Sequence, residues 1–174
     1  MEENCPSRTA LHVAIRRALH QVLDNPRIFD DPIALRVLGL ESASAQDANR
    51  KPLEETPLSR IARALISLSE GYCVQILEEN PLSRVLRASL AARSRYAEEE
   101  LRASIRQGVG QYVVLGAGLD AFAYRNPYPL GVLHVFEVDR PATQIWKRAR
   151  LEKAGIPYPQ TITFAPVDFG DPDS

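Results

Sequence analysis

Residues 111–120 read QYVVLGAGLD, an apolar run that stops at two glycines one residue apart and then meets an acid. The run from Tyr112 to Leu115 is short enough to form a strand buried on both faces. Gly116 and Gly118 have no Cβ atoms at a point where the chain must turn sharply or let a ligand approach the backbone. The stretch therefore predicts the first βα turn of a nucleotide-binding α/β sheet, with a ligand above the carboxyl end of the strand.

The residues after this turn alternate between short helical and apolar segments. We predict a short helical segment from Leu119 to Arg125, a strand over 132–138, a helix from Pro141 to Gly155 and a strand over 161–169. A β-α-β-α-β order is typical of one half of a parallel sheet. Each predicted strand ends in polar features at the edge where such sheets bind ligands: Gly116, Gly118 and Asp120; Glu137 and Asp139; and Asp168.

The residues before the turn are predicted to be helical, and they surround one long loop. Helical spacing indicates helices over 7–23, 31–38, 57–70 and 81–107, whereas 41–56 has few large apolar residues. We interpret Asp30 and Asp31 as helix-capping residues, and His12 and His20 as ordinary helix histidines. The predicted organisation is a helical region, 1–107, packing on the first half of a sheet domain, 108–174, as one structural unit.

Arg93 is the unusual residue of the long helix. By helical spacing it shares a face with five apolar residues, Leu86, Leu90, Ala97, Leu101 and Ile105. An inward guanidinium needs an anionic or hydrogen-bonding partner. Three interpretations of Arg93 remain open. It forms an internal ion pair, its aliphatic stem is buried while its guanidinium reaches water, or it binds the carboxylate of a ligand. We expect the other charges to form exposed pairs four residues apart, Arg95 with Glu99 and Glu98 with Arg102.

Composition excludes several classes of protein. The chain has 174 residues, a net charge of −1 and 45% hydrophobic residues, which is ordinary for a globular domain and suggests neither nucleic acid nor an anionic membrane as a partner. Cys5 and Cys73 are far apart in the sequence, and the polar N-terminus does not resemble a secretory signal. We therefore expect a cytoplasmic chain without disulfides, with no metal site and no membrane span.

The turn also restricts the ligand. Gly116, Gly118 and Ala121 fit the dinucleotide pattern G-x-G-x-x-G/A, with acids about 20 residues further on. Asp120, however, would repel a pyrophosphate at the turn, and the helix that follows is short. A cationic ligand with a ribose and no phosphate suits an acid there better, and S-adenosylmethionine fits that description. A nicotinamide-dependent oxidoreductase is the alternative, and a non-catalytic fragment is a third.

Six segments in this order resemble the class I S-adenosylmethionine-dependent methyltransferases of the leucine carboxyl methyltransferase-like family. They are Ser7–Ala10, Arg27–Pro32, Ala92–Tyr96, Val114–Asp120, Phe136–Pro141 and Val167–Phe169. The resemblance implies an α/β fold, with an N-terminal helical cap followed by three parallel strands of a Rossmann-like methyltransferase sheet. It also implies S-adenosylmethionine as the cofactor and O-methyl transfer to a carboxylate or hydroxyl of a small molecule or protein.

By the same resemblance, four positions match residues that hold the cofactor's amino-acid end and ribose. Arg93 matches the arginine that binds the methionine carboxylate, and Gly116 and Gly118 match the turn beneath the cofactor. Asp139, with Glu137 close by, matches the acid that takes the ribose hydroxyls.

Two further positions complete the comparison with the family. Asp168, followed by Phe169, matches the acid after the third strand that accepts from the adenine amino group. Asp120 either orders the turn or helps the ammonium group. Ala121 and Arg140 replace the more common Thr and Gln, and neither is expected to contact the cofactor strongly.

The family continues with further strands after the point where this chain stops. We therefore expect a truncated product, one half of a split protein or a trimmed chain, which carries the cofactor site but not the acceptor site. The first strand would keep an unpaired edge and one apolar face would be partly uncovered, which predicts a missing C-terminal half or self-association there. No residue stands out as a catalytic base, and we expect little or no turnover by the chain alone.

Overall fold

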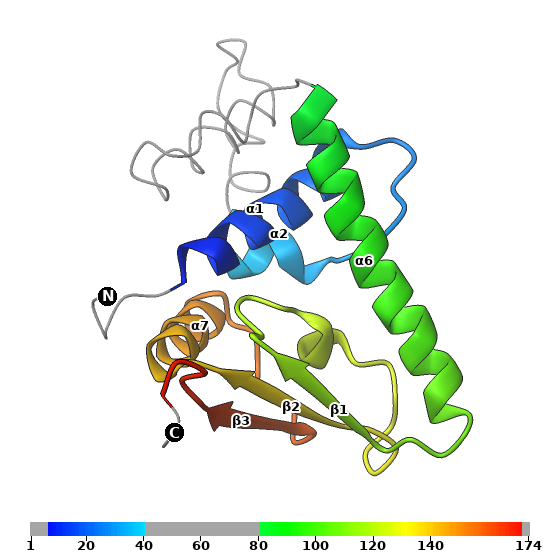
Figure 1. Ribbon diagram of the computed structural model, residues 1–174, viewed down its shortest axis with the longest axis vertical. Helices are drawn as coiled ribbons and strands as arrows, with labels where there is room; N and C mark the ends of the chain where they lie inside the picture. Colours follow the sequence, from blue (N-terminus) through cyan, green and yellow to red (C-terminus); the bar gives the residue numbers. More distant parts are fainter. Residues whose placement is uncertain (1–6, 41–80, 172–174) are drawn as a thin grey trace.

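The computed structural model describes residues 7–40 and 81–171. Helices α1, Arg8–Leu23, and α2, Ile33–Val37, lie on one side of the molecule, with the long helix α6, Pro81–Ile105, passing beside them (Figure 1). The three strands and α7, Pro141–Lys153, lie on the other side. The loop predicted over 41–56 and the helix predicted over 57–70 lie outside the described residues.

The sheet is parallel, in the order β1-β2-β3, which confirms the predicted α/β class. Its strands are β1, Gln111–Leu115, β2, His134–Asp139, and β3, Ile162–Pro166. The connection from β1 to β2 holds only one turn of 3₁₀ helix, η1, Phe122–Arg125. The second crossover is α7, which begins with Pro141 at its first turn, where the missing N–H costs no helical hydrogen bond.

The helices begin and end where capping chemistry allows. The Ala10 N–H donates to Ser7 Oγ (3.2 Å) at the start of α1. The α2 prediction needs a correction, because the capping position is Pro32 rather than Asp31. Asp31 still accepts a hydrogen bond from the Ile33 N–H (3.2 Å), but it is fully buried and also binds Arg17, so capping is only part of its role.

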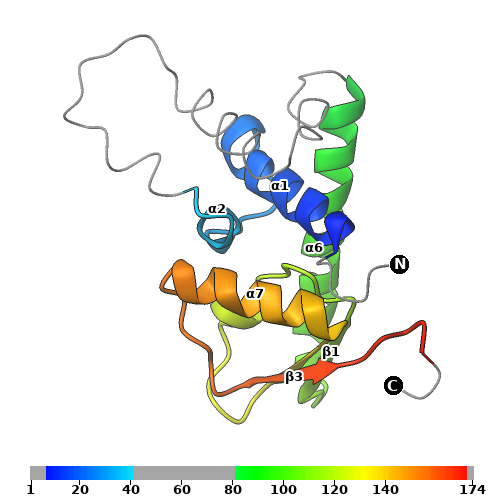
Figure 2. The same ribbon diagram turned by 90° about the vertical axis from the view of Figure 1, so that its left-hand side faces the viewer.

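Two apolar cores connect these layers. One joins α1 and α2 to α7 and the glycine turn, and includes Ile15, Leu19, Leu151 and Leu119. The other lies between α6 and the sheet, where Leu101 packs with Phe122 and Val135. Seen from the side, α7 lies between the sheet and the helices α1 and α2 (Figure 2).

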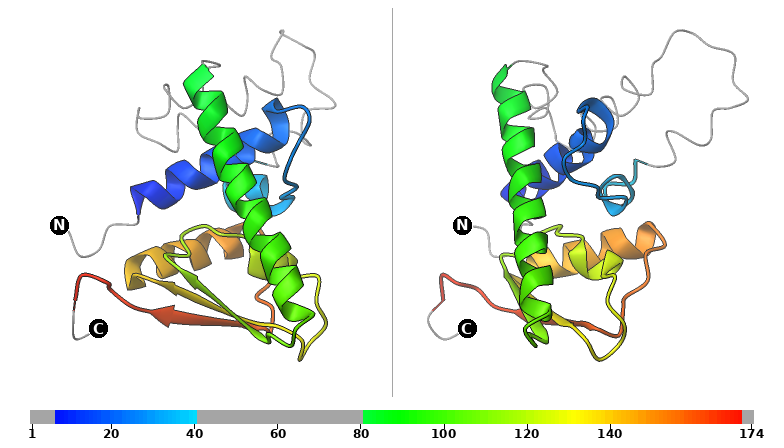
Figure 3. Two further views of the ribbon diagram at one scale, coloured as in Figure 1. Left: turned by 45° about the vertical axis from the view of Figure 1, so that its right-hand side comes forward. Right: turned by 90° about the vertical axis from the view of Figure 1, so that its right-hand side faces the viewer.

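The two faces of the sheet differ, and β1 is not buried on both, which was the prediction from its apolar run. Val113 and Leu115 are 51% and 68% exposed, whereas Val135 and Glu137 on the opposite face are each 1% exposed. Among the described elements, α7, η1 and the end of α6 all lie over the second face (Figure 3). β1 pairs only with β2 among the described strands, so the predicted free edge and uncovered face are both present.

The buried face of α6 agrees with the prediction in part, because four of the five predicted apolar residues are buried or half-buried. The exceptions are Leu86, which is 39% exposed, and Arg93, which faces a pocket but is exposed rather than buried. The buried guanidinium of this helix is that of Arg87, 2% exposed, which donates to both carboxylate oxygens of Asp24 (2.9 and 3.3 Å). The arginine of α6 that forms a buried ion pair is therefore Arg87, six residues before Arg93.

Other charge predictions on the helices had mixed outcomes. Arg95 and Glu99 form the expected exposed pair (2.7 Å). Glu98 instead turns inward and pairs with Arg125 on η1. His20 is a buried helix histidine, bonded to Asp24 through Nδ1 (2.8 Å). In the part of the chain that the structure describes, no helix has the length and apolar content to cross a bilayer.

Candidate functional site

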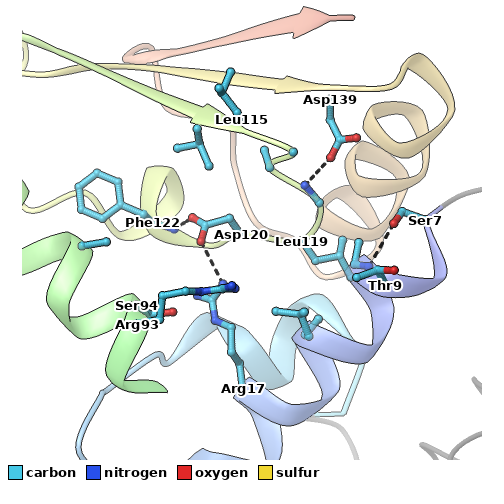
Figure 4. A pocket seen from close by; sticks show the side chains of 18 of the residues that line it. Ser7, Thr9, Arg17, Arg93, Ser94, Leu115, Leu119, Asp120, Phe122 and Asp139 are labelled. Carbon is cyan, nitrogen blue, oxygen red and sulfur yellow. Dashed lines mark hydrogen bonds and ion pairs between the residues drawn. The ribbon is translucent and has the colours of Figure 1, made fainter. Parts of the chain in front are cut away.

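A pocket of about 480 Å³ opens between α1, α6 and the turn after β1 (Figure 4). The turn supplies its floor, α1 one wall and α6 the other. Five of the eight predicted site residues line it: Arg93, Gly116, Gly118, Asp120 and Asp139. The carboxyl end of β1 is thus hollow, as the glycine pattern predicts.

The two glycines of the turn have different functions. Both have positive φ angles, 64° at Gly116 and 49° at Gly118, which side-chain-bearing residues rarely adopt. A Cβ on Gly116 would meet nothing within 4 Å, but a Cβ on Gly118 would lie 2.8 Å from the Cβ of Ala10. Gly118 is therefore needed for the close packing of α1 on the turn, in addition to any approach of a ligand.

Backbone hydrogen bonds fix Asp139 at one end of the pocket. The Gly118 N–H donates to Asp139 Oδ2 (2.6 Å), and the Arg140 N–H donates to Oδ1 (2.7 Å). The side chain is 8% exposed and lines the pocket. Each carboxylate oxygen has a second lone pair, so Asp139 can still accept hydrogen bonds from a ligand.

Arg17 and Asp120 form the centre of the pocket. Arg17 Nη1 donates to Asp120 Oδ2 (3.1 Å), and the Phe122 N–H donates to Asp120 Oδ1 (2.9 Å) (Figure 4). Burial alone would raise the pKa of the Asp120 carboxyl, but the positive charges of Arg17 and Lys147 outweigh it and hold the pKa below its ordinary value. Asp120 is therefore a carboxylate at neutral pH.

Arg17 is only 5% exposed and lines the pocket, but it was not among the predicted site residues. It belongs to a group that we call the buried charge cluster, which consists of Arg17, Asp31, Glu98, Asp120 and Arg125. Arg17 binds Asp31 as well as Asp120, while Arg125 binds Glu98 and lies 3.4 Å from Asp31. The spacing of Ala10, Ala14 and Arg17 along one helix face was the available signal for an inward arginine.

Arg93 stands on the opposite wall from this arginine. It and Ser94 lie on α6 and face the pocket from the side opposite the N-terminal part of α1 (Figure 4). Its guanidinium is exposed, so it can meet an anionic group without the desolvation cost of a buried charge. The pocket thus has a cation at its mouth and acids at its floor.

Three predicted site residues lie outside this pocket. Glu137, 1% exposed, binds Lys147 Nζ (2.5 Å), a side chain that is itself 1% exposed. Burial raises the pKa of the Glu137 carboxyl, against the opposing effect of Lys147. Asp168 pairs with Arg140 (3.1 Å), and Phe169 is 61% exposed. Arg140, which was not expected to contact the cofactor strongly, is thus the partner of a predicted adenine-binding acid.

The comparisons with known proteins agree on one family. A family model with the description "Leucine carboxyl methyltransferase" matches residues 10–174. "Putative S-adenosyl-L-methionine-dependent methyltransferase YktD" of Bacillus subtilis is 35% identical over 97% of this chain and 54% of its own length. A "Putative S-adenosyl-L-methionine-dependent methyltransferase" of Mycobacterium marinum is 33% identical over 94% of this chain and 47% of its own length. A protein with the same description from Mycolicibacterium gilvum is 40% identical over 47% of this chain and 32% of its own length.

The family model and the Bacillus subtilis and Mycobacterium marinum proteins match nearly the whole chain, but neither relative is matched along its whole length. The chain spans about half the length of the curated relatives that match it end to end.

Proposed function

Because this chain belongs to the leucine carboxyl methyltransferase family, we propose that its pocket binds S-adenosylmethionine and that it forms the cofactor-binding half of an O-methyltransferase. The observation that carries the proposal is the placement of Asp120. An ionised carboxylate lies in the turn where a dinucleotide would place its pyrophosphate, so the pocket favours a cationic ligand over a phosphate.

The residues around the pocket suggest how the ligand lies. Asp139 accepts the ribose hydroxyls, because it is fixed at the end of β2 and retains free lone pairs. Arg93 binds the carboxylate of the methionine moiety at the mouth. Gly116 lets the ligand lie against the backbone, since nothing lies within 4 Å of the place where its Cβ would be.

The adenine is proposed to lie beyond Asp139, towards the end of β3. Asp168 stands there and is 37% exposed in its side chain. Arg140 binds its Oδ2, and its Oδ1, which accepts from the Gly170 N–H (3.0 Å), has a second lone pair that can accept from the adenine amino group. Phe169 follows it and offers an exposed ring. Glu137 supports the site indirectly by anchoring β2 to α7 through Lys147.

The reaction we propose is an in-line displacement at the sulfonium methyl carbon. The acceptor oxygen forms the new bond, the carbon–sulfur bond breaks, and its electron pair stays on sulfur, which becomes a neutral thioether. The protein's main contribution is to position the two reactants. A carboxylate acceptor needs no base, while a hydroxyl must lose its proton to one. The acceptor, a carboxylate or a hydroxyl, is part of the proposal.

Calorimetric titration of wild type and two single variants tests this function. We expect wild type to bind S-adenosylmethionine, Asp139→Asn to lose about tenfold in affinity, and Arg93→Ala to lose a similar factor, because each removes a charge-assisted hydrogen bond. Arg102→Ala is the matched control, since Arg102 is exposed on the same helix and outside the pocket. Unchanged binding by Arg93→Ala would remove the clamp, and binding of NAD in place of S-adenosylmethionine would overturn the proposed function.

A further inference from the structure

The buried charge cluster carries an excess of negative charge. Its two arginines face three carboxylates, so its net charge is −1 with all five groups ionised. The members come from five separate segments of the described chain, and their ion pairs hold them together beside the pocket. Arg17, Glu98 and Asp120 all line the pocket, two negative groups and one positive, so the excess charge is on its surface.

The charges around the cluster do not neutralise it. Lys147 is paired with Glu137, and Arg140 is paired with Asp168. The remaining charged residues that line the pocket are Arg93 and Asp139, which have opposite signs. The described lining and the cluster together therefore remain negative by one charge.

We propose that this excess negative charge makes the pocket distinguish the sulfonium of S-adenosylmethionine from the thioether of S-adenosylhomocysteine. The inference rests on the proposed function, because it assigns that same pocket a preference between donor and product. The two ligands share the adenosine and the zwitterionic amino-acid group, and differ by a methyl group and one positive charge. The negative pocket wall attracts the positively charged donor, but the product has no net charge to attract. This difference favours replacement of the bound product by a new donor molecule after each methyl transfer.

The effect is electrostatic, so it acts without direct contact with sulfur. Side chains in a partly enclosed pocket are screened less than exposed ones, and one unit charge several ångströms away changes affinity by about fivefold to tenfold. Removing one negative charge from the cluster should therefore weaken the donor's binding and leave the product's binding nearly unchanged.

Glu98→Gln is the most informative variant. It removes one charge, keeps an oxygen that can accept from Arg125, and leaves Arg125 beside Asp31. Calorimetry with both ligands should show S-adenosylmethionine bound about fivefold more weakly and S-adenosylhomocysteine bound within about twofold of wild type. Asp120→Asn should change the ratio of the two dissociation constants in the same direction.

Glu99→Gln is the matched control, because it is the same change at the next residue, on an exposed side chain that pairs with Arg95 outside the pocket. We expect it to leave the ratio unchanged. If wild type binds both ligands and Glu98→Gln and Asp120→Asn keep its ratio, the charge discrimination is refuted while the proposed function stands. If wild type binds neither ligand, the proposed function itself fails, and the discrimination with it.

Discussion

The two ends of the pocket hold their acids by different means. At the β2 end, the N–H groups of Gly118 and Arg140 fix Asp139. At the α1 end, the Phe122 N–H holds one oxygen of Asp120, and a side chain holds the other, because Arg17 reaches it from a helix 103 residues earlier in the sequence. The first arrangement depends on the backbone path of one turn, and the second on the docking of separate helices. We call these the backbone end and the side-chain end.

The difference predicts how each end fails. A change at the side-chain end leaves a buried charge without its partner, while a change at the backbone end forces the turn into a new path. The first should lower stability more than the second for a single substitution.

The largest effect is expected for Arg17→Met. This change leaves the fully buried Asp31 with Arg125, at 3.4 Å, as its remaining cation, and removes the cation that binds Asp120. We expect the free energy of unfolding to fall by about 4 kcal/mol in urea denaturation, as for other broken buried ion pairs. Arg16→Met is the matched control at the neighbouring residue, and an equal loss in both variants would show that the cluster has no special role.

A smaller effect is expected at the backbone end, for Gly118→Ala. The new Cβ would lie 2.8 Å from the Cβ of Ala10 at a φ of 49°, so we expect a loss of about 3 kcal/mol in the same measurement. Gly116 has a similar φ, but an added Cβ there would meet nothing within 4 Å, so Gly116→Ala should lower the free energy of unfolding by only about 1 kcal/mol. Equal losses would mean that α1 does not pack against the turn in solution.

The smallest effect is a pH dependence that originates at Asp120. Because its pKa is lower in the folded chain than in the unfolded one, its contribution to stability is present above about pH 4 and is lost as the pH falls through the folded pKa. Asp120→Asn should flatten the acid limb of the stability curve, measured by urea denaturation from pH 3 to pH 7. Asp171→Asn, on an exposed residue after β3, should leave that limb as in wild type.

The sequence predicted the backbone end well, because local signals determine it. The glycine pair, the apolar run before it and the acid at the end of β2 lie within one βαβ unit, where the carboxyl ends of parallel strands meet. The parallel direction of the strands and the short η1 followed from the same signals. Within that unit, Glu137 lies outside the pocket and binds Lys147, ten residues on, a pairing that no local signal in the sequence indicated.

The sequence predicted the side-chain end poorly. Arg17 meets Asp120 only after α1 docks on the turn, and helical periodicity says nothing of that contact. The same limit applies to α6, where periodicity did not show that Arg87 is the buried arginine, paired with Asp24, while Arg93 stays exposed. The apolar run of β1 predicted burial on both faces, yet Val113 and Leu115 have no described element over them.

Amide hydrogen exchange with and without ligand tests most directly whether the two ends form one S-adenosylmethionine site. With saturating S-adenosylhomocysteine, exchange should slow at the amides of 116–122 and in the α6 segment 93–98, and stay unchanged at the start of α6. NAD at the same concentration should slow none of them. Protection by NAD, or no protection at the glycine turn with S-adenosylhomocysteine, would contradict the proposed site.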